Sequence, residues 1–103
     1  MPTYLITNRA PEGYVGAADA MTAWNAWFDR LADNLADRGN PVFARSIVGN
    51  CGPDTELGGY TLITADNLDA ALALARDCPM IAAGGGVEVG ELTLLNSGRR
   101  ALV

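Results

Sequence analysis

The sequence predicts an α+β fold with the element order β-α-β-β-α-β, and a few segments carry most of that prediction. Apolar residues recur every three or four positions between residues 17 and 38, which indicates a long helix packed through one face. Residues 59–64 are rich in strand-forming side chains and lead into a shorter helical pattern at residues 66–78. After three glycines, residues 87–95 alternate like a strand. A chain of 103 residues accommodates these elements in one domain.

The first half of the chain is expected to supply a strand, a helix and a second strand. A short run of strand formers at residues 4–7 is followed by a loop at residues 8–16, which contains two glycines and a proline. The helix at residues 17–38 should end at Gly39, and Pro41 forbids its continuation. Its apolar stripe comprises Ala20, Trp24, Trp27, Phe28, Leu31 and Leu35.

The second strand is expected at residues 42–48. There Arg45 shares a strand face with two large apolar residues, Phe43 and Ile47, which is unusual for a surface arginine. Residues 49–55 read as a turn-rich connection to the third strand.

The second half of the chain repeats the pattern. Two glycines at the start of the third strand permit a close backbone approach or a bulge. Asp66 is the expected N-cap of the second helix, whose buried stripe would be Leu68, Ala71, Leu72 and Ala75, and Cys78-Pro79 should end it. The alternation changes phase at Gly90, which predicts a bulge or bend in the last strand.

This order predicts the ferredoxin-like arrangement, in which an antiparallel four-stranded sheet carries two helices on one face. The opposite face of the sheet needs a cover, and a second copy of the same sheet supplies one. We therefore expect a homodimer joined through sheet faces. The domain should span residues 1–95, with residues 96–103 as a C-terminal tail or dimer arm.

Composition excludes several classes of function. The formal net charge is −5 and the only adjacent basic pair is Arg99-Arg100, so a nucleic-acid partner is not expected. The chain has no histidine and only two cysteines, which argues against a metal site or a disulfide framework. No signal peptide and no membrane-length apolar run are recognisable. We expect a cytoplasmic protein without a cofactor.

Four motifs carry a family resemblance: Leu-Gly-Gly-Tyr at residues 57–60, Leu-Asp-x-Ala at 68–71, Cys-Pro at 78–79 and Gly-x-Val-Glu-Val at 85–89. With them the chain resembles the YCII-related (DGPF-type) family. The resemblance implies a dimeric α+β barrel with a cleft between the sheet and the long helix. It also implies relatives among lyases, isomerases and cofactor-free monooxygenases. Some family members are suspected of using a histidine–aspartate pair, which this chain cannot form. The family's Asp-Gly-Pro-Phe segment is here Cys51-Gly52-Pro53-Asp54.

Two sets of residues are candidates for ligand binding. The aromatic cluster of Trp24, Trp27 and Phe28 is suited to a pocket for a planar or apolar molecule, and equally to ordinary core packing of a helix on a sheet. Arg45 is suited to an anionic ligand, and equally to a salt bridge between subunits.

Cys51 and Tyr60 are further candidates for ligand binding, and the candidates for chemistry lie around the third strand. Cys51 would need a base to act as a nucleophile, and the chain has no histidine to provide one. Asp54, Glu56 and Tyr60 are weak candidates for acid–base roles, and their alternative is turn solvation and strand packing. The leading hypothesis is a homodimer with a cleft for a small organic molecule, which as an enzyme would be a cofactor-free lyase or isomerase. The competing hypothesis is a non-catalytic binding or assembly module with a filled cleft.

Overall fold

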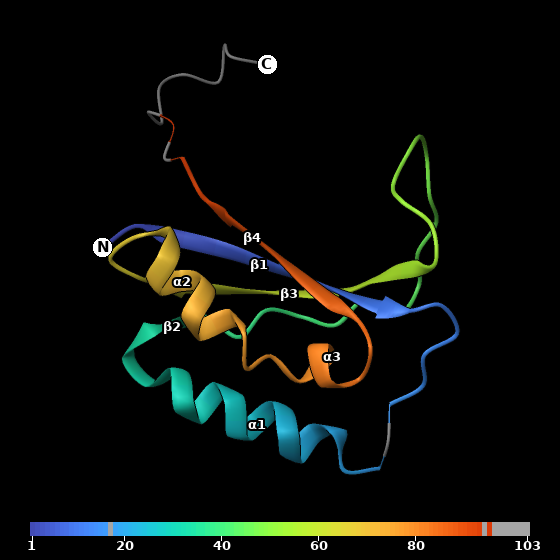
Figure 1. The fold of residues 1–103 in the computed structure, drawn as a ribbon, viewed down its shortest axis with the longest axis horizontal. Coiled ribbons are helices and arrows are strands. Elements are labelled where there is room, and N and C mark those ends of the chain that lie inside the picture. The colour runs from blue at the N-terminus through green and yellow to red at the C-terminus, as the bar shows by residue number, and fades with distance from the viewer. Residues whose placement is uncertain (17, 94, 96–103) are drawn as a thin grey trace.

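Four strands form one antiparallel sheet in the computed structural model, which describes residues 1–16, 18–93 and 95. β1 spans Thr3–Pro11, β2 spans Leu35–Asp37, β3 spans Thr55–Thr64 and β4 spans Gly86–Glu91. Their order across the sheet is β2-β3-β1-β4, so the two long strands lie at the centre and the two short strands at the edges. The predicted ferredoxin-like α+β fold is confirmed (Figure 1).

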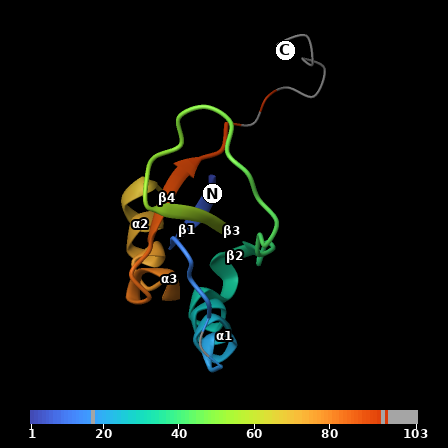
Figure 2. The same ribbon diagram turned by 90° about the vertical axis from the view of Figure 1, so that its right-hand side faces the viewer.

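The helices pack on one face of this sheet. α1 spans Ala20–Leu31, α2 spans Leu68–Ala75 and the single-turn α3 spans Pro79–Ala82, and a short 3-10 turn, η1, covers Ala32–Asn34. All three α-helices contribute to one core cluster with the strands, and Figure 2 shows them gathered on the same side of the sheet. Within the described residues, no helix covers the opposite face of the sheet.

Alternation along β1 sets the core. Residues 4, 6, 8 and 10 are buried and their neighbours are partly exposed, as expected for a strand with one covered face. Tyr4 and Ile6 meet Ile63 of β3 and the α1 side chains Trp27 and Leu31, each exposed by 1% or less. These large apolar side chains make up the centre of the core.

The predicted strand at residues 42–48 is wrong, and so is the length of the first helix. Ala32 adopts a positive φ of 49°, which ends α1 after Leu31. The chain then enters β2, where Leu35 pairs with Ile63. Leu35 satisfies the helical spacing from Leu31 and equally suits an edge strand, so periodicity alone could not separate the two. β2 pairs with Leu62 and Ile63 only, and the chain meets the same edge again where Pro41 bridges to Gly59 and the Val42 amide donates to the Gly58 carbonyl. The segment after Val42 then leaves the sheet as a projecting loop.

Three details of the second half also differ from the prediction. Asn67, rather than Asp66, caps α2, and its side chain accepts a hydrogen bond from the Ala70 amide. Pro79 does not only end a helix but begins the next one, a position that proline tolerates. No register shift interrupts β4 at Gly90, which pairs directly with Leu5.

Of the two features that the glycines of the third strand permit, a close backbone approach or a bulge, the structure contains the bulge. Asn8 of β1 pairs with Gly59 while Arg9 pairs with Leu57, so Gly58 is the extra residue of β3. The predicted buried stripe of α2 holds for Ala71 and Ala75, whereas Leu68 is 47% exposed. The tail predicted at residues 96–103 lies outside the described residues. No helix in the described part of the chain is long and apolar enough to cross a membrane.

Replacing Gly39 with alanine should destabilise the fold strongly. Gly39 has φ 74°, and a side chain there would overlap the carbonyl group of Tyr60. We expect Gly39→Ala to lower the free energy of unfolding by about 3 kcal/mol. Gly49 also has a positive φ, of 82°, but nothing lies within 4 Å of the added carbon, so Gly49→Ala should cost only about 1 kcal/mol. Urea unfolding of both variants measures this, and equal losses would contradict the assigned backbone contact.

Candidate functional site

A cavity of about 530 Å³ lies between the first half of α1, the sheet and the loop that follows β2. Its volume falls within the range of about 300–1,000 Å³ that is typical of small-molecule sites. Most of its wall is apolar. It is lined by residues of β1, β3, α1 and α3 and of two loops: Asn8, Ala10, Tyr14, Val15, Gly16, Ala20, Met21, Trp24, Phe28, Arg38, Gly39, Asn40, Pro41, Val42, Phe43, Arg45, Gly58, Gly59, Tyr60, Thr61 and Met80.

One face of α1 supplies the aromatic wall of the cavity. Trp24 and Phe28 are four residues apart, so they lie on the same side of the helix, with ring centres 5.9 Å apart. Trp27 lies behind them in the core, where its indole Nε1 donates a hydrogen bond of 3.1 Å to the carbonyl oxygen of Leu74. The predicted cluster therefore divides: two rings border the cavity, and the third fixes α1 to α2.

Asn8 places an amide group at the sheet side of the cavity. It is only 6% exposed, on the helix-facing side of β1, and its Oδ1 has no hydrogen-bond partner among the described residues. A side chain on Gly58 would clash with this oxygen, so the glycine of the bulge makes room for the amide. A buried polar atom without a partner costs about 1–3 kcal/mol, which marks Asn8 as a candidate ligand contact.

Two arginines give the cavity its charge. The Arg38 guanidinium lies 4.5 Å from the centre of the Phe28 ring, and its Nη2 donates a 2.6 Å hydrogen bond to Asn25 Oδ1. Arg45 forms a salt bridge with Glu56 and donates a 2.9 Å hydrogen bond to the Val42 carbonyl. The cavity wall, as far as the structure describes it, contains no carboxylate. The charged side chains of the described wall are therefore both arginines, although the chain is acidic overall.

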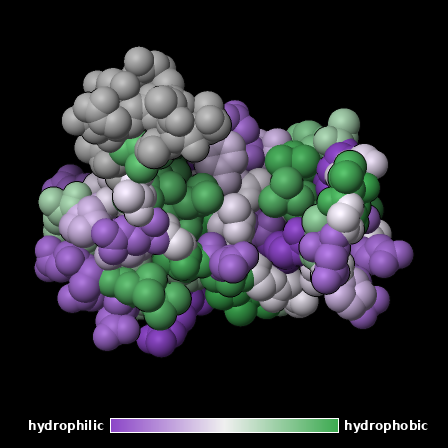
Figure 3. Space-filling model, turned by 90° about the horizontal axis from the view of Figure 1, so that it is seen from above, coloured by the Kyte–Doolittle hydropathy of each residue, from purple (hydrophilic) through white to green (hydrophobic). Residues whose placement is uncertain are grey.

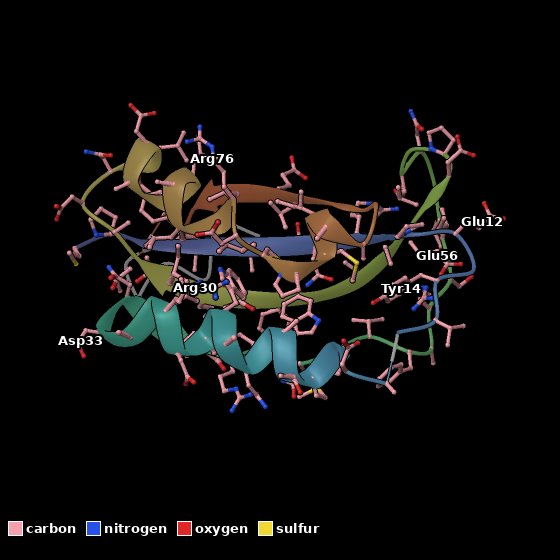
Figure 4. All side chains as sticks on the ribbon, turned by 60° about the horizontal axis from the view of Figure 1, so that its bottom comes forward. Glu12, Tyr14, Arg30, Asp33, Glu56 and Arg76 are labelled. Atoms are coloured by element: carbon pink, nitrogen blue, oxygen red, sulfur yellow. The ribbon has the colours of Figure 1, made fainter. Side chains whose placement is uncertain are left out.

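The candidate residues around β3 are spread over three places. Tyr60 borders the cavity at the sheet edge, where its hydroxyl accepts a 3.2 Å hydrogen bond from Asn40 Nδ2. Glu56 does not border the cavity itself but reaches Arg45, which does. Figure 4 shows Glu56 at the same end of the molecule as Tyr14, another cavity residue. Asp54 is exposed and lies outside the wall, in the projecting loop.

The two thiols lie away from the cavity wall. Cys51 is exposed in the projecting loop, with its sulfur 3.7 Å from the Val48 carbonyl oxygen. Cys78 is buried, and desolvation raises the pKa of its thiol to about 11, so it is protonated at neutral pH. No cluster of three or more histidine, cysteine or acidic side chains suited to a metal ion occurs in the described ranges.

Sequence reasoning missed five polar residues of the cavity: Asn8, Tyr14, Arg38, Asn40 and Thr61. Asn8 and Tyr14 fell within a stretch interpreted as a loop, and Arg38 was taken as the end of a helix. A signal for Asn8 was present: it continues the alternation of Tyr4 and Ile6 at a position where a buried strand usually has an apolar residue. Arg38 carried no comparable signal, because its place depends on where α1 ends.

Comparison with known proteins identifies the family. The family model described as YCII-related domain matches residues 2–94. The chain belongs to the YCII-related family. A search of curated proteins found no match for this member.

A solved structure with a similar fold is available for comparison with this YCII-related protein. It is the 5-chloro-2-hydroxyhydroquinone dehydrochlorinase of Burkholderia phenoliruptrix AC1100, in complex with 2,5-dihydroxybenzoquinone. The TM-score is 0.64, and the match covers 88% of this chain and 93% of the dehydrochlorinase. Sequence identity is 19%, so the likeness supports the fold and does not transfer an activity.

Exchanging each tryptophan for phenylalanine should separate the core from the cavity wall. Trp27→Phe removes the hydrogen bond to Leu74 and leaves a void, so we expect the free energy of unfolding to fall by about 2 kcal/mol. Trp24 is only half-buried, and Trp24→Phe should cost less than about 1 kcal/mol. Chemical denaturation of the two variants tests the division. A larger loss for Trp24→Phe would contradict it.

Proposed function

We propose that this YCII-related protein binds a small planar organic molecule in the cavity beside α1. The observation that carries the proposal is an aromatic wall, formed by Trp24 and Phe28, that faces about 530 Å³ of space instead of packed side chains. Aromatic side chains hold flat rings through offset or edge-to-face contacts. A cavity of this size favours the proposal over a module whose cleft is filled.

The structural relative suggests the size of the molecule. Its complex contains 2,5-dihydroxybenzoquinone, a single oxygenated six-membered ring. The two proteins share the fold at low sequence identity, so this compound serves as a first probe for the cavity and not as an assigned substrate. A single ring fits comfortably within the measured volume.

A second candidate function is a cofactor-free reaction of the lyase or isomerase type. The pairing of Arg45 with Glu56 beside the cavity favours it, because a carboxylate can remove a proton while a guanidinium stabilises the oxyanion that forms. Tyr60 would then act as a hydrogen-bond donor at the sheet edge. A time-dependent change in the absorbance of the bound probe, lost in Glu56→Gln, would distinguish turnover from binding.

A homodimer in the cytoplasm remains part of the proposal. Leu5 and Leu62 pair directly on the sheet face that the helices leave uncovered. On the projecting loop, Phe43, Ile47 and Val48 are between 58% and 94% exposed. In Figure 3, which looks down from the side opposite α1, apolar side chains gather at the right-hand end over this loop. A second copy that covered the loop and the sheet face would remove this apolar surface from water.

Ligand binding should raise the melting temperature, and a filled cavity should abolish the effect. Binding to the folded state alone stabilises it, so we expect 2,5-dihydroxybenzoquinone to shift the thermal transition of the wild type upward. Ala20→Trp places a ring inside the cavity and should eliminate the shift. Ala26→Trp adds the same ring on the exposed side of α1 and should retain it. Equal shifts in the two variants would show that the compound binds elsewhere, and no shift in the wild type would count against this probe.

Sedimentation equilibrium should show a dimer at micromolar concentration, with twice the 10.8 kDa mass of the chain. We expect Val48→Asp to shift the population toward monomer, because it introduces a charge into the covered surface. Leu68→Asp makes the same change at an exposed leucine of α2 and should leave the mass unchanged. A monomeric wild type would overturn the sheet-to-sheet arrangement.

A further inference from the structure

We infer that the cavity selects a hydroxylated aromatic anion, whose hydroxyl group meets Asn8 and whose anionic group meets Arg38. The inference rests on the proposed function and specifies the ligand class of the same site. Contacts within the fold do not fully use either polar group. Asn8 lacks a hydrogen-bond partner for its carbonyl oxygen, and Arg38 lacks an acidic partner among the described residues. Each offers an unmet interaction to a molecule in the cavity.

Charge is the first argument. Two guanidinium groups border the cavity, and no carboxylate does so within the described part of its wall. Glu56 neutralises Arg45, whereas Arg38 contacts only the neutral Asn25 amide and the face of the Phe28 ring. Arg38 is exposed and its charge is solvated by water, but no acidic side chain among the described residues pairs with it beside the aromatic wall. An anionic substituent on a ring packed against Phe28 would provide the counterion.

The amide of Asn8 is the second argument. It is nearly excluded from solvent at the centre of the sheet, where an unpartnered polar group is costly. A ligand hydroxyl both donates and accepts hydrogen bonds, so it can pair with either end of the amide after rotation about the terminal bond. A hydroxyl group is therefore the substituent that best satisfies this position.

The spacing across the sheet is the third argument. Asn8 lies on β1, and Arg38 directly follows β2, with β3 between the two strands. Thr61 of β3 lies beside Arg38, since its hydroxyl donates a 3.1 Å hydrogen bond to the Arg38 carbonyl, and it pairs with Ile6, two residues before Asn8. Two strand spacings and this offset of two residues separate the Asn8 and Arg38 backbones by roughly 12 Å. The Asn8 and Arg38 side chains extend into part of this distance. A single ring with polar groups at opposite ends spans the gap between the ends of the two side chains.

Three related probes test the inference by isothermal titration calorimetry: 4-hydroxybenzoate, benzoate and 4-hydroxybenzyl alcohol. The second lacks the hydroxyl group and the third lacks the charge. We expect 4-hydroxybenzoate to bind the wild type about tenfold more tightly than either analogue, since each polar contact is worth about one factor of ten. Added salt should weaken binding of the two anions and leave the alcohol unaffected.

Arg38→Gln should weaken binding of the anionic probe selectively. We expect about a tenfold loss for 4-hydroxybenzoate and less than a twofold change for 4-hydroxybenzyl alcohol. Arg30→Gln makes the same charge change in the last turn of α1, outside the cavity wall, and should alter neither affinity. In Figure 4, Arg30 lies toward the opposite end of α1 from Tyr14 and Glu56.

Asn8→Leu should have opposite effects on stability and binding. It replaces an unpartnered polar group by an apolar one of similar size, so the ligand-free protein should melt at a higher temperature. The same variant should bind 4-hydroxybenzoate no better than benzoate. A lower melting temperature together with an unchanged preference for the hydroxyl group would show that Asn8 is purely structural.

The results distinguish this inference from the proposed function. One outcome would overturn the ligand class and leave the planar-ligand site intact. In that outcome the three probes bind with equal affinity, Arg38→Gln does not change the affinity, and Ala20→Trp abolishes binding. Absence of binding for all three probes and for 2,5-dihydroxybenzoquinone would overturn both.

Discussion

The antiparallel pairing of β1 with β3 is the constraint on which the rest of this structure depends. These two central strands carry Tyr4, Ile6 and Ile63, around which the helices assemble. The same pairing contains the bulge at Gly58, which shifts the register beside Asn8. A bulge increases local twist and leaves one residue unpaired, and this bulge lies at the cavity end of the strand pair, since Gly58 and Gly59 both border the cavity. The core and the cavity thus lie at opposite ends of the β1–β3 pair.

α1 contributes side chains to both the core and the cavity wall. Trp27 and Leu31 point into the core and are almost fully buried, whereas Trp24 and Phe28 border the cavity at intermediate exposure. The indole of Trp27 is held by the Leu74 carbonyl, so α1 is fixed against α2 by a directed bond as well as by packing. The helix that carries the aromatic wall is therefore anchored to the rest of the fold, and an anchored wall loses less entropy when a ring packs against it.

The element order and the bulged third strand were predictable because their signals are local. Glycine pairs, capping residues and alternation each act within a few residues. The end of α1 was not predictable, because Leu35 fits both a helix stripe and an edge strand, and its pairing with Ile63 decides between them. The wrong strand prediction at residues 42–48 followed from the same error: Leu35–Asp37 supply the edge strand, and only residues 41 and 42 of the following segment pair with β3.

The site was less predictable than the fold for the same physical reason. Trp24 and Phe28 could be named from their spacing, but their division from Trp27 depends on which helix lies behind them. Arg38 enters the cavity only because α1 ends early and the chain turns back along β3. Long-range placement, not residue type, therefore determines which polar groups meet in this cavity.

The position of Asn8 joins stability to function. In a protein whose net stability is about 5–15 kcal/mol, an unpartnered buried amide costing about 1–3 kcal/mol is a substantial fraction. The fold accommodates it through the glycine of the bulge, and the neighbouring core positions on β1 are filled by large apolar side chains. A molecule that pairs with the amide would recover that free energy on binding. The interaction then contributes more to affinity than the same hydrogen bond at an exposed site, where water already satisfies the group.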